Sequence, residues 1–214
     1  MSDYTPALGY RWLTPLYDSA IALLTRERHW RRLLLAQAAP RAGDRILDVG
    51  CGTGTFALML KQACPAAEVM GIDPDPEVLA RARAKAAAAG ADIAFVAGFV
   101  PEMPPARLNA PTKIVSSLVF HQIPLEGKRG LLRAIRALLA DGGELHIADY
   151  GAQRSRLMRA LFRGTVQVLD GTADTQPNAD GVLPQIMRDA GFASVEETRI
   201  VPTATGSISL LKAR

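Results

Sequence analysis

Residues 45–57 read RILDVGCGTGTFA, and this stretch predicts how the chain folds. The apolar side chains of Ile46, Leu47 and Val49 are typical of a buried strand, and three glycines follow at every second position. Apolar residues then recur with the spacing of one helix face, at Phe56, Met59, Leu60 and Ala63. A strand, a glycine turn and a helix together let a ligand approach backbone without side chains at the start of the helix.

The composition indicates an ordinary globular protein of one domain. The 214 residues are 49% hydrophobic and 21% charged, which is enough to bury a full core. No apolar run approaches a membrane span, and residues 1–12 lack the layout of a signal peptide. With two cysteines and a net charge of +4, we expect a cytoplasmic protein without a disulfide framework and without nucleic acid as a partner.

The pattern on either side of the glycine turn predicts strands that alternate with helices, and therefore a mostly parallel sheet covered on both faces. Further strands are expected at 68–73, 93–96, 114–120 and 144–150, and an antiparallel pair at 195–201 and 207–212. Asp75 and Pro76 suit the start of the helix that Gly90 ends.

The same pattern divides the expected single domain, 1–214, into four parts. Residues 1–40 are expected to form a helical lid, with helices that only pack on the core as the alternative, and 41–150 to form the ligand-binding core. Residues 151–182 contribute one inserted helix at 154–169 and a polar loop over the acceptor site, and 183–214 hold the last helix and the antiparallel strands.

Two ligand classes fit the glycine turn, and Asp48 separates them. A relaxed dinucleotide fingerprint runs through Gly52, Gly54 and Ala57, and Asp73 stands where an acid bonds a ribose hydroxyl. Asp48 would repel a diphosphate but attract a ligand that carries an ammonium and a sulfonium. We therefore favour S-adenosylmethionine and keep a nucleotide-dependent oxidoreductase as an alternative.

Segment 46–54, ILDVGCGTG, resembles motif I of the class I S-adenosylmethionine-dependent methyltransferases. Segments 71–73, 118–124 and 138–145 resemble later motifs of that family, and 16–18 and 29–32 are most similar to its ubiquinone and menaquinone C-methyltransferase branch. The resemblance covers about residues 16–150. It implies a Rossmann-like three-layer α/β sandwich with a seven-stranded sheet of order 3-2-1-4-5-7-6, in which strand 7 is antiparallel.

The resemblance also implies the residues that bind the cofactor. Asp48 and the glycines would line its methionine half, Asp73 would bond the ribose hydroxyls, and Phe99 stands where many members have an acid that reads the adenine. Stacking by Phe99 is one replacement for that acid, and the question stays open. The full expected set is Tyr17, Asp48, Gly50, Cys51, Gly52, Gly54, Asp73, Pro74, Gly98, Phe99, Ser117 and Leu118.

His121 is the candidate catalytic base, because an imidazole can take a proton near neutral pH. The alternative is a histidine that shapes the rim of the pocket. Methyl transfer does not require a base, since the sulfonium is an activated donor and orientation alone supplies about 7–11 kcal/mol in well-aligned systems. No cluster has metal-ligand spacing, so no metal is expected.

The sequence therefore predicts methyl transfer from S-adenosylmethionine to a small molecule. A protein that binds this cofactor without transferring methyl is the second interpretation. The arginine-rich helix at 154–169 suits a solvated face, an acidic acceptor or peripheral contact with a membrane surface, without stable insertion. The acceptor, the methylated atom and the oligomeric state, including a homodimer, stay open.

Overall fold

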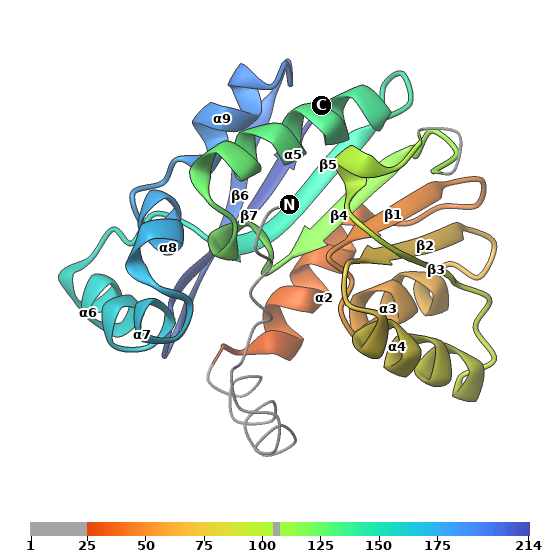
Figure 1. Cartoon of the computed structure of the whole chain (residues 1–214), viewed down its shortest axis with the longest axis horizontal. Coiled ribbons are helices and arrows are strands. Elements are labelled where there is room, and N and C mark those ends of the chain that lie inside the picture. The colour runs from red at the N-terminus through yellow and green to blue at the C-terminus, as the bar shows by residue number, and fades with distance from the viewer. Residues whose placement is uncertain (1–24, 105–107) are drawn as a thin grey trace.

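The computed structural model describes residues 25–104 and 108–214, and its centre is one seven-stranded sheet (Figure 1). The strands are β1 (Arg45–Val49), β2 (Glu68–Asp73), β3 (Ala94–Ala97), β4 (Lys113–Ser117), β5 (Glu144–Tyr150), β6 (Val195–Thr203) and β7 (Gly206–Ala213). They lie in the order β3-β2-β1-β4-β5-β7-β6, and β7 is antiparallel to both neighbours. The predicted sheet order is confirmed.

Helices cover both faces of the sheet, because adjacent residues of a buried strand point to opposite sides. Ile46 of β1 packs in one apolar core with helices α2 (Glu27–Ala38) and α3 (Thr55–Ala63). Leu47, the next residue, packs in a second core with α5 (Leu125–Leu138) and α9 (Leu183–Asp189). Helix α2 is the described part of the predicted lid, and residues 1–24, with Tyr17, lie outside the described residues.

Helix α4 (Pro76–Ala88) begins and ends where the sequence predicts. The Asp75 side chain accepts hydrogen bonds from the backbone amides of Glu77 and Val78, and Pro76 occupies the first turn. Gly90 follows the helix with a positive φ of 62°, a conformation that glycine adopts without strain. The Asp75 amide also donates to the carboxylate of Asp73, two residues earlier at the carboxyl end of β2.

The prediction for strand four was wrong at its carboxyl end. The strand stops at Ser117, because Leu118 has a φ of 56° and residues Phe120–Gln122 form a short 3-10 helix, η3. The amides of Val119 and Phe120 donate to the Asp149 carboxylate at 2.9 and 2.6 Å. A carboxylate from β5 therefore pulls this segment out of the sheet.

The inserted segment also differs from the prediction of one helix and a loop. It forms three helices, α6 (Arg156–Gly164), α7 (Val166–Asp170) and α8 (Thr172–Ala179). Thr165, between α6 and α7, has non-helical backbone angles. The polar stretch was expected to be a loop, yet it buries Thr175 and Asn178, and the Asn178 amide donates to the Tyr150 carbonyl at 2.9 Å.

Among the described helices, none is long and apolar enough to cross a membrane.

Candidate functional site

A cavity of about 710 Å³ opens at the carboxyl ends of β1, β2 and β4. Its volume falls in the range of small-molecule sites, and crevices outside the carboxyl ends of parallel strands are where such sheets bind ligands. It gathers seven residues that the sequence predicts for cofactor binding: Gly50, Gly52, Asp73, Pro74, Gly98, Phe99 and Leu118. Further lining residues include Val100, Val119, Ile123, Leu131 and Asp174. Their roles toward a ligand stay predictions.

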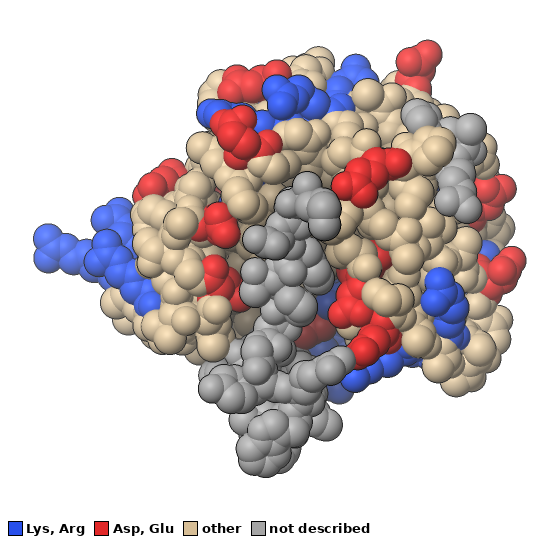
Figure 2. All heavy atoms as spheres, viewed as in Figure 1, with Lys and Arg blue, Asp and Glu red and all other residues tan. Residues whose placement is uncertain are grey.

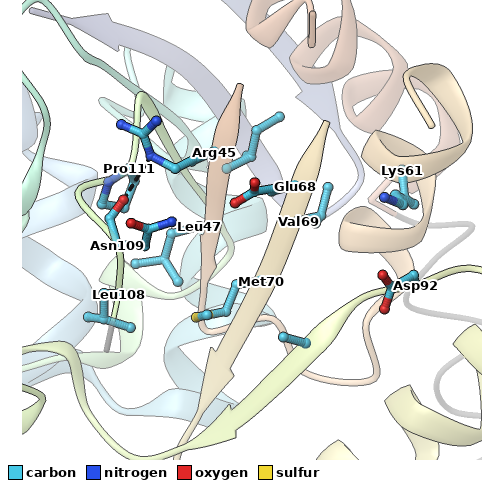
Figure 3. Close-up of a pocket in the computed structure, with 12 residues that line it drawn as sticks. Arg45, Leu47, Lys61, Glu68, Val69, Met70, Asp92, Leu108, Asn109 and Pro111 are labelled. Atoms are coloured by element: carbon cyan, nitrogen blue, oxygen red, sulfur yellow. Dashed lines mark hydrogen bonds between the residues drawn. The ribbon is translucent and has the colours of Figure 1, made fainter. Parts of the chain in front are cut away.

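A second cavity, of about 240 Å³, lies at the opposite edge of the sheet (Figure 3). Arg45 and Glu68, the first residues of β1 and β2, line it together with Lys61 and Asp92. The Arg45 guanidinium there donates to the backbone carbonyls of Asn109 and Ala110. The glycine turn has no part in this cavity, so the larger one is the candidate site.

The glycine turn offers a ligand open space rather than backbone amides that are free to donate hydrogen bonds. The amides of Gly50 and Cys51 both donate to the Ile72 carbonyl, at 2.8 and 3.1 Å. The Gly52 amide donates to Asp73 at 2.9 Å. Because residues of β2 engage these amides, the absence of side chains, as expected from the three glycines, is what a ligand can use here.

Gly50→Ala is expected to lower the free energy of unfolding by about 1–3 kcal/mol. Gly50 has a φ of 68°, and an added Cβ would lie 2.3 Å from Cγ2 of Val119. Val119 cannot easily move aside, because its amide is bonded to Asp149. Urea denaturation measures the loss, and Gly43→Ala is the control, with a φ of 84° and no atom within 4 Å of the added Cβ. Equal losses in the two variants would contradict a steric cause.

The Asp73 carboxylate faces the cavity at the end of β2. It accepts the amides of Gly52 and Asp75 at 2.9 and 3.0 Å, one at each oxygen. Burial raises the pKa of this carboxyl above its usual value, although the two amides lower it. A carboxylate has about four acceptor positions, so about two remain for hydroxyl groups of a ligand.

Asp48 is buried behind the glycine turn and does not line the cavity. Within the described residues, neither of its carboxylate oxygens has a hydrogen-bond partner. Burial raises the pKa of Asp48 to about 7, although the positive charge of Arg31 and a weaker contact with the Ala57 amide oppose the rise. A buried carboxylate without a partner is unfavourable, and a nearby cation would relieve that cost.

Three more predicted residues also lie outside the cavity lining: Cys51, Gly54 and Ser117. Cys51 is buried, and burial raises the pKa of its thiol, so it suits packing rather than reactivity. Gly54 directly precedes α3 as its N-cap, and an added Cβ there would meet Ala82 and Phe95 at 2.9 Å. Gly54 is therefore needed for helix packing.

His121 lies beside the cavity in η3, with its imidazole between two carboxylates. Its Nδ1 is 2.8 Å from Oδ1 of Asp149, and its Nε2 is 3.5 Å from Oδ2 of Asp170 in α7. Burial lowers the pKa of His121, but Asp149 and Asp170 together raise it to about 9. The imidazole is therefore charged at neutral pH and has no free nitrogen to accept a proton. This geometry argues against the predicted role as a base.

Lys128 is a charged residue of this region that the sequence analysis did not single out. It is fully buried, and its ammonium donates to the carbonyls of Ile123 and of Asp174 in α8. Burial lowers its pKa to about 8, although Asp149 and Asp174 oppose this. The sequence did contain a signal for its burial: Lys128 lies three residues before Leu131 and therefore on the apolar face of α5. Lys128 and His121 both tie the inserted helices to the segment after β4.

Comparison with known proteins shows several similarities. The methyltransferase domain family matches residues 46–143. The demethylmenaquinone methyltransferase of Thermus thermophilus is 42% identical over 202 residues, which cover 91% of this chain and 89% of that one. The protein of the same name from Deinococcus radiodurans is 34% identical over 155 residues, covering 71% of this chain but only 62% of its own length.

Solved structures support the fold. The magnesium protoporphyrin IX methyltransferase of Synechocystis, determined with bound SAH, has a TM-score of 0.71 at 20% identity, and the match covers 96% of this chain and 89% of that one. The YcgJ protein of Bacillus subtilis has a TM-score of 0.69 at 16% identity, covering 87% and 97%. At these identities the likeness concerns the fold alone.

Proposed function

Because this chain belongs to the class I S-adenosylmethionine-dependent methyltransferases, in the ubiquinone and menaquinone C-methyltransferase branch, we propose that it methylates a small molecule in the 710 Å³ cavity. The observation that carries the proposal is the combination of two carboxylates: Asp73 lines the cavity, and Asp48 is buried behind the turn without a hydrogen-bond partner among the described residues. The first suits a ribose diol, and the second favours a cationic ligand over a diphosphate.

The proposed donor, S-adenosylmethionine, supplies an activated methyl group when bound. Asp73 would accept hydrogen bonds from its ribose hydroxyls, and Phe99, which is 39% exposed at the cavity wall, would contact the adenine. Gly50 and Leu118 border the same cavity between the ends of β1 and β4, where the methyl group would face the acceptor. Orientation and exclusion of water would then provide the rate, without a histidine base.

We further propose that α6, α7 and α8 cover the acceptor side. Asp174 of α8 lines the cavity, and the bonds of His121 and Lys128 hold α7 and α8 beside it. Demethylmenaquinone is the first acceptor to assay, because relatives carry the name of that substrate, and carbon is the first atom to examine.

Asp73→Ala is expected to weaken the binding of S-adenosylhomocysteine about 10- to 100-fold, because charge-assisted hydrogen bonds to the ribose are lost. Isothermal titration calorimetry measures the affinity. Asp92→Ala is the control, since it removes the same charge from the cavity at the opposite edge of the sheet. Unchanged affinity of the Asp73 variant would remove Asp73 from the site, and no binding by the wild type would overturn the proposal.

Phe99→Ala is expected to weaken S-adenosylhomocysteine binding about 3- to 10-fold, through loss of contact with the adenine ring. The matched control is Leu157→Ala, which truncates an exposed apolar side chain of α6 that does not line the cavity. Equal affinity of both variants would assign Phe99 to packing alone.

Two assays separate the proposal from its alternatives. Mass spectrometry of acceptors incubated with enzyme and S-adenosylmethionine detects the added methyl group, which a protein that only binds the cofactor would not produce. A thermal-shift comparison of NAD with S-adenosylhomocysteine tests the oxidoreductase, which requires stabilisation by NAD.

A further inference from the structure

The inserted segment concentrates positive charge. Residues 151–169 contain four arginines and no acidic residue. Arg156, Arg159 and Arg163 follow one another at helical spacing along α6, and all three are exposed. The Arg159 side chain donates to the Gln153 carbonyl, whereas the side chains of Arg156 and Arg163 have no hydrogen bond or ion pair within the described residues. Two of these guanidinium groups are therefore available to an external anion.

The same segment also exposes apolar side chains. Leu157, Val168 and Leu169 are 63%, 73% and 57% exposed. Among the described residues, the other exposed large apolar side chains are less exposed: Phe99, at the cavity, is 39% exposed, and Ile200, in strand β6 at the edge of the sheet, is 42% exposed. Scattered exposed apolar residues need no explanation, but three within thirteen positions mark a candidate contact surface.

Helices α6 and α7 form one corner of the molecule, which we call the α6–α7 corner (residues 156–170). Figure 1 shows both helices projecting away from the sheet, at the opposite end from α3 and α4. In Figure 2, Lys and Arg atoms extend outward from the edge where α6 lies. Helix α8, which packs against both helices, contributes Asp174 to the cavity. The corner therefore lies next to the candidate site.

Three environments suit this basic surface to different extents. Water solvates the arginines, but exposure of Leu157, Val168 and Leu169 to water is unfavourable. A nucleic acid would bind the arginines, but aliphatic side chains do not offer its bases the aromatic stacking that single strands use. An anionic bilayer matches both features, because its phosphates attract arginine and its acyl boundary accepts aliphatic side chains.

We propose that the α6–α7 corner docks on the surface of anionic phospholipid bilayers. Arg156 and Arg163 contact lipid phosphates, and Leu157, Val168 and Leu169 enter the boundary between headgroups and acyl chains. This docking is independent of methyl transfer and goes beyond it, since it concerns where the protein resides while it works. Neither the arginines nor the three apolar residues line the cofactor cavity.

Sedimentation with lipid vesicles tests the proposal on the full chain. We expect binding to phosphatidylglycerol-containing vesicles that is at least tenfold tighter than to pure phosphatidylcholine vesicles and that weakens as salt is raised. The double variant Arg156→Glu/Arg163→Glu should bind at least tenfold more weakly, and Leu157→Ser/Leu169→Ser about tenfold more weakly.

The control variant Arg81→Glu/Arg133→Glu makes the same change in net charge at exposed positions of α4 and α5. It should change vesicle affinity less than threefold. An equal loss in this control, an unchanged affinity of either corner variant, or tighter binding to a short single-stranded RNA than to the vesicles would overturn the proposal. S-adenosylhomocysteine affinity, measured in parallel, confirms that each variant is folded and reports separately on the proposed methyltransferase activity.

Discussion

Asp48→Asn is expected to gain stability relative to the wild type by about 3–4 kcal/mol as the pH is raised from about 4 to about 8. Burial raises the pKa of Asp48 from 3.8 to about 7 in the folded protein, and none of the described residues forms a hydrogen bond with its carboxylate oxygens. Between these values the folded state binds a proton that the unfolded state has released. The wild type therefore loses stability as the pH rises through this window, and the asparagine variant does not.

Urea denaturation of both proteins across this pH range measures the difference between them, in which other titrating groups cancel. Asp44→Asn is the matched control with the opposite sign. Although burial raises the pKa of Asp44, the bond to Lys113 and other contacts lower it overall, so its stabilisation is present above the unfolded pKa and is lost at lower pH. If Asp48→Asn also became relatively less stable at higher pH, the buried charge would have a partner.

The same substitution reports on the ligand. A cation bound over the glycine turn should relieve part of the cost of the Asp48 charge, so the wild type gains binding energy that the asparagine variant lacks. S-adenosylmethionine should therefore lose affinity in Asp48→Asn while the free protein gains stability. If the variant lost both ligand affinity and stability, the substitution would instead have damaged the fold.

His121→Gln is expected to destabilise the protein by about 3 kcal/mol at about pH 6, with the deficit disappearing above about pH 9. Burial lowers the pKa of His121, but Asp149 and Asp170 raise it from 6.5 to about 9. A raised folded pKa gives stability that is complete below 6.5 and is lost as the pH rises through 9. We therefore expect the charged imidazole to position the inserted helices rather than to accept a proton.

His146→Gln is the control for the removal of a buried histidine. Burial lowers the pKa of His146 to about 4, although Glu144 opposes this, so the residue is neutral and its deficit should not vary between about pH 7 and 10. The rate of methyl transfer provides a second test. If the wild-type rate depends on a group with a pKa near 6.5, and His121→Gln abolishes that dependence, then His121 is the base. If the stability deficit of His121→Gln did not vary with pH, this would contradict the ion pairs of His121 with Asp149 and Asp170.

Local sequence patterns were sufficient for most elements. Strands 68–73 and 144–150, the Asp75 cap and the antiparallel end pair follow from apolar spacing and turn residues alone. The resemblance added the order of the sheet. It also implied that Asp73, Gly98 and Leu118 belong to one cofactor site, and all three line the cavity at the carboxyl ends of the parallel strands.

The electrostatics of the site depended on residues that are distant in the sequence. His121 is bonded by Asp149 of β5 and Asp170 of α7, and no local spacing brings these three groups together. The polar residues of α8 suggested a loop. The local sequence could not show that they are buried, because the contact of Asn178 with Tyr150 is a tertiary one. Local pattern determined which elements form, and the family resemblance indicated which strand ends meet. Only packing determined which charges are paired and which are buried alone, because burial and distance set the energy of a charge.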